Sequence, residues 1–545
     1  MNPTIGLVER MRWMSALAAA AILSVGAIVA LSLIGKPLTA PTTVPAPAGS
    51  SAVLDPRIGT IAASHPNRVI QTIVQFDAGV TAAAQRSDVA LVSGRVTGDL
   101  HIINGLAVKL TAAQAGKLAS SGGVHAVSLN TKIAPQDAPE AIDLDTTFNQ
   151  TLGTSALWHL PSALTGDGVG VAVIDTGIDG NLPDFRGDNG RSRVVATAVT
   201  NSGASTVMDT YGHGTHVAGI IAGNSTNRSW GDPLRGKFAG VAPDANLVSI
   251  KVSDDNGNAS VLNVIYGLQF AVDHMQAYNI RVVNMSLDAT TPQSYTVDPL
   301  DAAVESAWFH GLVVVAAAGN RGTAPDAVQY APANDPYVIT VGAVDQNGTA
   351  NTRDDVIASW SSQGTTQDGF SKPDVYAPGA HIVSLLAPNS TFASACSDCI
   401  VDGQYITAGG TSMAAPMISG LVADMLQLHP NWTPAQVKGD LTSPLVRSNR
   451  TIAEVSALRA VLMPFPPVAD QHLTPSNFLR GRTGAINYSR STWSRSTWST
   501  AQGSLSAGFA RSSWSCTCGE TSTTGTVDPS RSAWSNASWS SSVYQ

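Results

Sequence analysis

The stretch Val169-Gly-Val-Ala-Val-Ile174 is followed directly by Asp175-Thr-Gly-Ile-Asp179. A short, uninterrupted apolar run rich in β-branched residues predicts a strand that is buried on both faces of a sheet. Asp175 then stands at the carboxyl end of this strand, where open parallel sheets bind their ligands. We therefore expect a parallel sheet with a functional site at the edge that carries Asp175.

Apolar runs of the same kind recur downstream, separated by segments with helical patterns. They cover residues 246–252, 280–284, 312–317 and 338–344. Apolar strands that alternate with helices predict an α/β fold, in which a parallel sheet is flanked by helices on both faces. We assign residues 150–462 to this domain.

A smaller module precedes this domain at residues 67–135. Strand patterns over 69–76, 100–110 and 124–128 alternate with helical patterns over 81–92 and 111–120. This alternation predicts a small α+β module.

The first 36 residues have the pattern of an export segment. Arg10 and Arg12 precede an uncharged, apolar run of 22 residues over 13–34. This run is long enough to cross a bilayer, and the basic residues before it favour a cytoplasmic N-terminus. The sequence does not distinguish a cleaved signal peptide from a retained membrane anchor. The remaining chain is predicted to be secreted, or anchored with its folded part outside the cytoplasm, and residues 37–66, rich in Pro, Ala, Thr and Ser, are predicted to be a linker.

Composition and charge narrow the classes of partner. The chain has 545 residues, of which 43% are hydrophobic and 13% charged, and its net charge is −8. These values indicate a globular protein of more than one domain and argue against a nucleic-acid partner. The four cysteines occur as two local pairs, Cys396 with Cys399 and Cys516 with Cys518. We favour local disulfides, which an exported chain permits.

Residues 475–545 differ in character from the rest of the chain. Ser, Thr, Gly and Arg dominate, and a Trp-Ser core recurs at irregular spacing, which excludes a regular solenoid. Two interpretations stay open: a solvated tail, and a segment that binds a surface through its tryptophans.

Three further polar residues have the sequence context of catalytic groups. His213 opens His213-Gly-Thr-His-Val-Ala-Gly219, Ser412 lies within Gly410-Thr-Ser-Met-Ala-Ala-Pro416, and Asn320 ends Ala316-Ala-Ala-Gly-Asn320. With Asp175 they could perform nucleophilic catalysis, because a carboxylate orients the imidazole that takes the proton of the serine hydroxyl. The Asn320 amide and the backbone N–H of Ser412 are then candidate donors to an oxyanion.

The order Asp175, His213, Ser412, with the residues around each, resembles the subtilisin-like serine proteases, or subtilases. The resemblance extends from about Gly168 to Leu441 and includes Val283-Asn-Met-Ser-Leu287. It implies a serine endopeptidase that cleaves proteins or peptides through an acyl-enzyme and needs no cofactor for its chemistry.

The resemblance also implies roles for other parts of the chain. Ser286, Leu287 and Gly319 are expected to bind substrate, with Ser286 and Leu287 on a strand that pairs with the extended substrate backbone. Residues 67–135 are expected to be an inhibitory propeptide that the enzyme itself removes by cutting within 132–150. Structural calcium is implied as well, but no residues of this sequence identify a site, and 254–258 are interpreted as a turn.

Some residues depart from the pattern of the family. Asp288 stands where relatives usually carry Gly, which would add charge near the substrate. The insert at 394–405 is expected to border the site, and Met417 is interpreted as a packing exchange. A binding protein on an inactive protease scaffold is the competing hypothesis, and the presence of all four catalytic positions disfavours it.

Overall fold

The computed structural model describes residues 52–134, 138–139, 148–225, 235–479 and 538–540. All of these belong to one of two compact units, Pro47–Gln545. No helix in these ranges has the length and apolar character needed to cross a membrane. The apolar run at 13–34, the first part of the predicted linker and the Cys516–Cys518 pair lie outside them.

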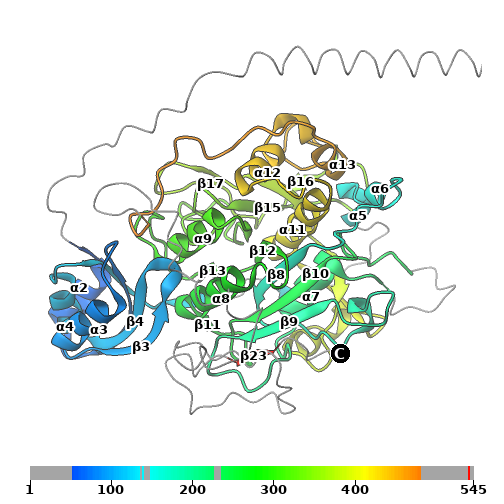
Figure 1. The fold of residues 1–545 in the computed structure, drawn as a ribbon. Helices are drawn as coiled ribbons and strands as arrows, with labels where there is room; N and C mark the ends of the chain where they lie inside the picture. The colour runs from blue at the N-terminus through cyan, green and yellow to red at the C-terminus, as the bar shows by residue number, and fades with distance from the viewer. Residues whose placement is uncertain (1–51, 135–137, 140–147, 226–234, 480–537, 541–545) are drawn as a thin grey trace, which may run out of the picture. The chain divides into compact units, whose positions relative to one another are not determined.

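A central sheet of mainly parallel strands organises the larger domain (Figure 1). Parallel pairing joins, in order, β9 (Val194–Val199), β10 (Asn246–Lys251), β8 (Gly170–Asp175), β12 (Ile280–Met285), β14 (Val313–Ala317), β15 (Ile339–Asp345) and β19 (Val375–Pro378). Antiparallel strands β16 (Val356–Ile357) and β23 (Ser538–Ser540) pair with β15 and β9. Every residue of β8 and β14 is buried, as the apolar runs predict. The predicted α/β fold class is therefore confirmed.

Helices on both sides of the sheet complete the core. α7 (His213–Ala222) packs against α11 (Thr411–Leu428), and α8 (Val261–His274) packs against α9 (Pro299–Phe309). The shorter helices are α5 (Phe148–Leu152), α6 (Ser155–Trp158), α10 (Thr391–Ala395), α12 (Pro434–Leu441) and α13 (Ala457–Val461). α11 contacts β8, β12, β14 and β15, so its buried N-terminus lies at the sheet. Met417 in this helix is fully buried, as its interpretation as a packing residue requires.

The N-terminal module is a sheet of order β1-β5-β2-β4-β3 with helices packed on one face. Its strands are β1 (Val53–Leu54), β2 (Val69–Phe76), β3 (Arg95–Leu100), β4 (Gly105–Thr111) and β5 (Val124–Leu129). Its helices are α2 (Pro56–Ser64), α3 (Ala82–Leu91), α4 (Ala112–Ala119) and the 3₁₀ turn η1 (His101–Ile103). The second face joins the core of the larger domain through residues such as Ile73 and Ile102.

Predicted bounds are wrong in three places. The strand pattern over 100–110 corresponds to the end of β3, the turn η1 and most of β4, and β3 begins earlier, at Arg95. Residues 53–64 form β1 and α2, although the linker was predicted to extend to 66. Asp55 caps α2 by accepting a hydrogen bond from the Arg57 backbone N–H, and Pro56 occupies the first helical turn. At the other end, Ser476 and Phe478 are buried against the fold, so the tail predicted to begin at 475 begins later.

Two short strands lie between the module and the larger domain along the chain. β6 (Lys132–Ala134) pairs antiparallel with β11 (Ala259–Ser260) and β13 (Asp288–Ala289). β7 (Ala138–Pro139) pairs antiparallel with β22 (Tyr405–Gly409), which also pairs with β20 (Ile382–Leu385) and β21 (Ile400–Val401). The chain that joins the two domains therefore contributes a strand to each of two sheets of the larger domain.

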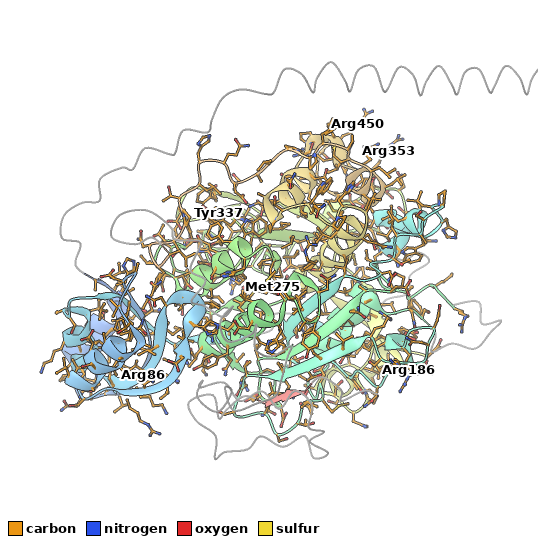
Figure 2. All side chains as sticks on the ribbon, viewed as in Figure 1. Arg86, Arg186, Met275, Tyr337, Arg353 and Arg450 are labelled. Carbon is orange, nitrogen blue, oxygen red and sulfur yellow. A yellow bond between two sulfur atoms is a disulfide. The ribbon has the colours of Figure 1, made fainter. Side chains whose placement is uncertain are left out.

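Several arginine side chains lie on the outside of the fold. The arginines labelled in Figure 2, Arg86, Arg186, Arg353 and Arg450, are exposed, whereas Tyr337 is buried. Cys396 and Cys399 form the predicted local disulfide.

Removing apolar volume from the sheet should destabilise the larger domain. Ile250 in β10 is fully buried between Ile174 and Ala198 of the neighbouring strands. We expect Ile250→Ala to lower the free energy of unfolding by about 2–5 kcal/mol, because it leaves a cavity. Leu445→Ala is the control, since Leu445 is 71% exposed and its truncation should change this energy by less than about 0.5 kcal/mol. Guanidinium unfolding followed by circular dichroism measures both, and equal effects would contradict this packing.

Candidate active site

Asp175 and His213 meet at the carboxyl end of β8. Asp175 is the last residue of the strand, and His213 is the first residue of α7. The His213 Nδ1 atom lies 2.7 Å from Asp175 Oδ1, and both side chains are buried. Gly214 makes this approach feasible, because a Cβ atom there would stand 2.1 Å from the Gly177 carbonyl oxygen. The second ring nitrogen of His213 is thus held in a fixed orientation.

Asp209 fixes the loop that carries His213, a role that we did not predict. Its carboxylate accepts hydrogen bonds from the Gly212 N–H at 2.7 Å and from the Thr176 hydroxyl at 2.8 Å. It also accepts from the N–H and hydroxyl of Thr215, at 2.8 and 2.7 Å. Burial raises the pKa of this carboxyl, and the hydrogen bonds act in the opposite direction. Asp209 therefore ties the residue after Asp175 to both ends of the first turn of α7.

Ser412 is the second residue of α11 and is held from the sheet side. Its hydroxyl donates to the Ser286 carbonyl oxygen at 3.2 Å, and the Ser286 hydroxyl donates to the Ser412 carbonyl oxygen at 2.9 Å. The Asn284 amide nitrogen donates to the Ser286 hydroxyl at 3.0 Å. The Asn284 amide oxygen accepts from the hydroxyl of Ser419, which lies further along α11, at 2.8 Å. This buried chain of hydrogen bonds fixes α11 against the end of β12.

Asn320 follows β14 and is oriented by Thr411, the residue before Ser412. The Asn320 Oδ1 atom accepts from the Thr411 N–H at 2.9 Å and from its hydroxyl at 3.0 Å. The Gly319 N–H donates to the same hydroxyl oxygen at 3.0 Å. Because the amide oxygen faces Thr411, the amide nitrogen of Asn320 is directed away from it. The structure thus brings Asn320 and Ser412 to the same helix start.

The segment directly before the insert at 394–405 lies against the catalytic histidine candidate. The N–H groups of Thr391 and Phe392 donate to the carbonyl oxygens of Thr210 and Tyr211, at 3.0 and 2.9 Å. The Phe392 ring meets the His213 ring edge to face, with centroids 5.8 Å apart. Phe392 is a second site residue that sequence reasoning missed, because only the fold brings it to His213.

The expected substrate-binding residues lie beside this cluster. Leu287 and Ser286 are buried, and strand pairing begins after them, at Asp288 and Ala289 in β13. Asp288 forms an ion pair with Arg321, whose guanidinium carbon lies 3.6 Å from the Tyr330 ring centroid. The two charges offset each other, so Asp288 does not act as an isolated negative charge.

In the parts of the chain that the structure describes, no three His, Cys, Asp or Glu side chains lie together in a way that could hold a metal ion. His216, three residues after His213, is fully buried with its Nε2 atom 3.0 Å from the Ile406 carbonyl oxygen, so it belongs to the packed core. Asp254 accepts from the N–H groups of Asn256 and Asn258, each at 2.9 Å. These are the bonds of a turn, so this acidic stretch does not fit a calcium loop.

Comparison with known proteins gives one consistent family. Residues 166–454 match the Subtilase family. The serine protease AprX of Bacillus subtilis is 41% identical over 281 residues, which cover 50% of this chain and 60% of AprX. Subtilisin of Bacillus pumilus is 40% identical over 281 residues, which cover 51% of this chain and 84% of that protein.

A solved structure is also similar. Fervidolysin from Fervidobacterium pennivorans, described as a keratinolytic enzyme related to subtilisin, matches with a TM-score of 0.57 and 25% identity. The match covers 73% of this chain and 62% of fervidolysin. The chain spans about 60% of the length of AprX and of subtilisin E of Bacillus subtilis.

The bonds to Asp209 predict a specific cost of removing its charge. Asp209→Asn replaces one acceptor oxygen with an NH₂ group, which faces at least one existing donor. We expect the free energy of unfolding to fall by about 1–3 kcal/mol, because buried donors lose their partners. Asp167→Asn is the matched control, since Asp167 is exposed. Guanidinium unfolding measures both variants, and equal stability of the two would contradict the assigned role of Asp209.

Proposed function

This chain belongs to the subtilase family, and from that premise we propose that it is a serine endopeptidase. Ser412 would be the nucleophile, His213 the general base, Asp175 the residue that orients His213, and Asn320 a donor to the oxyanion. The observation that carries the proposal is the buried 2.7 Å hydrogen bond between Asp175 and His213. Because this bond is made by Nδ1, the nitrogen that would take the proton of Ser412 is Nε2.

The first half of the proposed reaction forms an acyl-enzyme. The Ser412 Oγ atom attacks the carbonyl carbon of the scissile peptide bond while His213 Nε2 takes the hydroxyl proton. The carbonyl oxygen becomes negative and accepts hydrogen bonds from the Asn320 amide and the Ser412 N–H. Loss of one such donor typically costs about 2.7–4 kcal/mol of transition-state stabilisation.

The second half regenerates the enzyme. The C–N bond breaks as His213 gives its proton to the leaving amine, and an ester to Ser412 remains. Water then attacks the ester carbonyl while His213 takes a proton from it. The bond from the acyl carbon to Ser412 Oγ breaks as His213 returns that proton to Oγ, and the carboxylic acid is released. This chemistry uses only side-chain and backbone groups of the chain itself.

Strand pairing supports a propeptide role for the N-terminal module. β6 pairs with β13, so Ala134 is opposite Asp288, two positions after Ser286. β7 pairs with β22, so Ala138 is opposite Gly409, three positions before Ser412. The chain thus enters and leaves the candidate site along strands, as an extended substrate would.

The two pairings also suggest where the chain is cut. Ala134 is paired on one side of the candidate site and Ala138 on the other. We propose that the enzyme cuts its own chain between Ala134 and Ala138. This narrows the interval of 132–150 that the sequence indicated.

Contacts with α8 support inhibition by the module before and after this cut. The Ile102 N–H donates to the Gln269 amide oxygen at 3.3 Å, and the Gln269 amide donates to the Asp99 carbonyl oxygen at 3.2 Å. His101 Nε2 lies 3.0 Å from the Asp273 carboxylate. Because these contacts do not involve 135–137, they would persist after cleavage and keep β6 in the site.

Export and surface attachment remain proposals. We propose that residues 1–36 direct the chain out of the cytoplasm and that the tail after 479 retains it at a surface through its Trp-Ser units. The composition of these segments supports both proposals.

Self-processing should depend on Ser412. We expect the full-length chain to release an N-terminal fragment that ends between residues 134 and 138, and Ser412→Ala to stay intact, because it lacks the nucleophile. Intact mass spectrometry against time measures both.

Ser397→Ala is the control, since Ser397 is exposed and lies in the neighbouring insert. It should be processed like the wild type. Processing of Ser412→Ala at the same rate, with no second protease present, would refute the nucleophile assignment.

A further inference from the structure

The segment Thr474–Leu479, called the C-terminal clamp below, is fixed to α9 and the loop before it. The Ser476 N–H donates to both oxygens of the Glu305 carboxylate, at 2.9 and 2.8 Å. The Asn477 N–H donates to the Thr296 carbonyl oxygen at 2.9 Å, and the Tyr295 hydroxyl donates to the Thr474 carbonyl oxygen at 2.8 Å. Ser476 and Glu305 are fully buried. These charge-assisted and backbone bonds anchor the clamp on the peptidase domain.

The other side of the clamp contacts the N-terminal module. The Gln75 amide donates to the Phe478 carbonyl oxygen, and the His125 Nε2 group donates to the Asn477 carbonyl oxygen. The rings of His125 and Phe478 meet edge to face, with centroids 6.3 Å apart. Gln75 and His125 lie on the adjacent strands β2 and β5.

Phe478 is the apolar centre of this contact. This residue is only 5% exposed, although the chain around it has no helix or strand. A buried aromatic ring in a contact between two domains, with hydrogen bonds to the backbone beside it, is typical of an interaction hot spot. The clamp is therefore bound to both the peptidase domain and the module.

We propose that the C-terminal clamp is a further binding surface for the propeptide-like module and retains it on the peptidase domain after the chain is cut. The clamp adds to the contacts that β6 and α8 make between the module and the peptidase domain. It thereby slows dissociation of the cleaved module from the peptidase domain. This inference rests on the proposed function, in which residues 52–134 are a cleaved inhibitor.

A comparison of two phenylalanines tests the clamp in the full-length chain. Phe478→Ala removes the buried ring, and Phe465→Ala is the matched control, because Phe465 is 88% exposed in the same part of the chain. We expect all chains to be cut at the same rate. The cut fragment should then dissociate from Phe478→Ala on the order of ten times faster than from the wild type or Phe465→Ala.

Intact mass spectrometry reports the cut, and size-exclusion chromatography of timed samples reports retention of the fragment. Retention equal to that of the wild type in Phe478→Ala would overturn the clamp. Absence of any cut in the wild type would instead contradict the proposed function, and the two failures are distinguishable because each has its own readout.

A second measurement requires no processing and applies if the cut fails. In Ser412→Ala, amide hydrogen exchange at Lys132–Ala134 reports how firmly the module is held. We expect added Phe478→Ala or His125→Ala to speed this exchange. Phe478→Ala should add little once His125→Ala is present, because both remove the contact between these two rings, whereas His125→Ala also removes the contact of His125 with Asp77. Unchanged exchange at 132–134 in both variants would overturn the proposal. Because these residues lie outside the clamp, a purely local packing role of Phe478 would leave their exchange unchanged.

Discussion

The parallel register of β8, β12 and β14 is the constraint on which the site depends. Parallel strands end at one edge of a sheet, so the residues that follow them are brought together whatever their separation in the chain. Asp175 ends β8, Ser286 follows β12 and Asn320 follows β14. α11 then places Ser412 at this edge, with its hydroxyl on the Ser286 carbonyl oxygen.

Hydrogen-bonded polar groups specify one arrangement of the segments that carry His213 and Ser412. A buried carboxylate is costly unless donors surround it, and Asp209 satisfies this requirement with donors from Thr176, Gly212 and Thr215. Asn320 is only partly buried, but its amide oxygen likewise accepts two hydrogen bonds from Thr411. Each cluster joins segments that are far apart in the sequence, and its hydrogen bonds form only when these segments are in the observed register. The clusters therefore favour the geometry in which His213 and Ser412 are held.

The sequence predicted the elements with strong periodicity and missed those that depend on tertiary contacts. β2 has the predicted bounds, and the apolar central strands differ from prediction by one or two residues, because burial on both faces leaves an unambiguous pattern. α2 was missed although Asp55-Pro56 is a helix-start signal, because its surroundings have the composition of a linker. Asp209, Phe392 and the C-terminal clamp have no local pattern, and only the folded chain brings them to their partners.

The central claim is that Ser412, activated by His213, carries the acyl group of the substrate. Its most direct test is to mix the processed enzyme with an activated ester, quench it in acid within milliseconds, and map the added mass by peptic digestion. The account predicts one acyl group on the peptide that contains Ser412, and none when His213 is replaced by Ala. An acyl group on another residue, or peptide-bond cleavage without any acyl-enzyme, would contradict it.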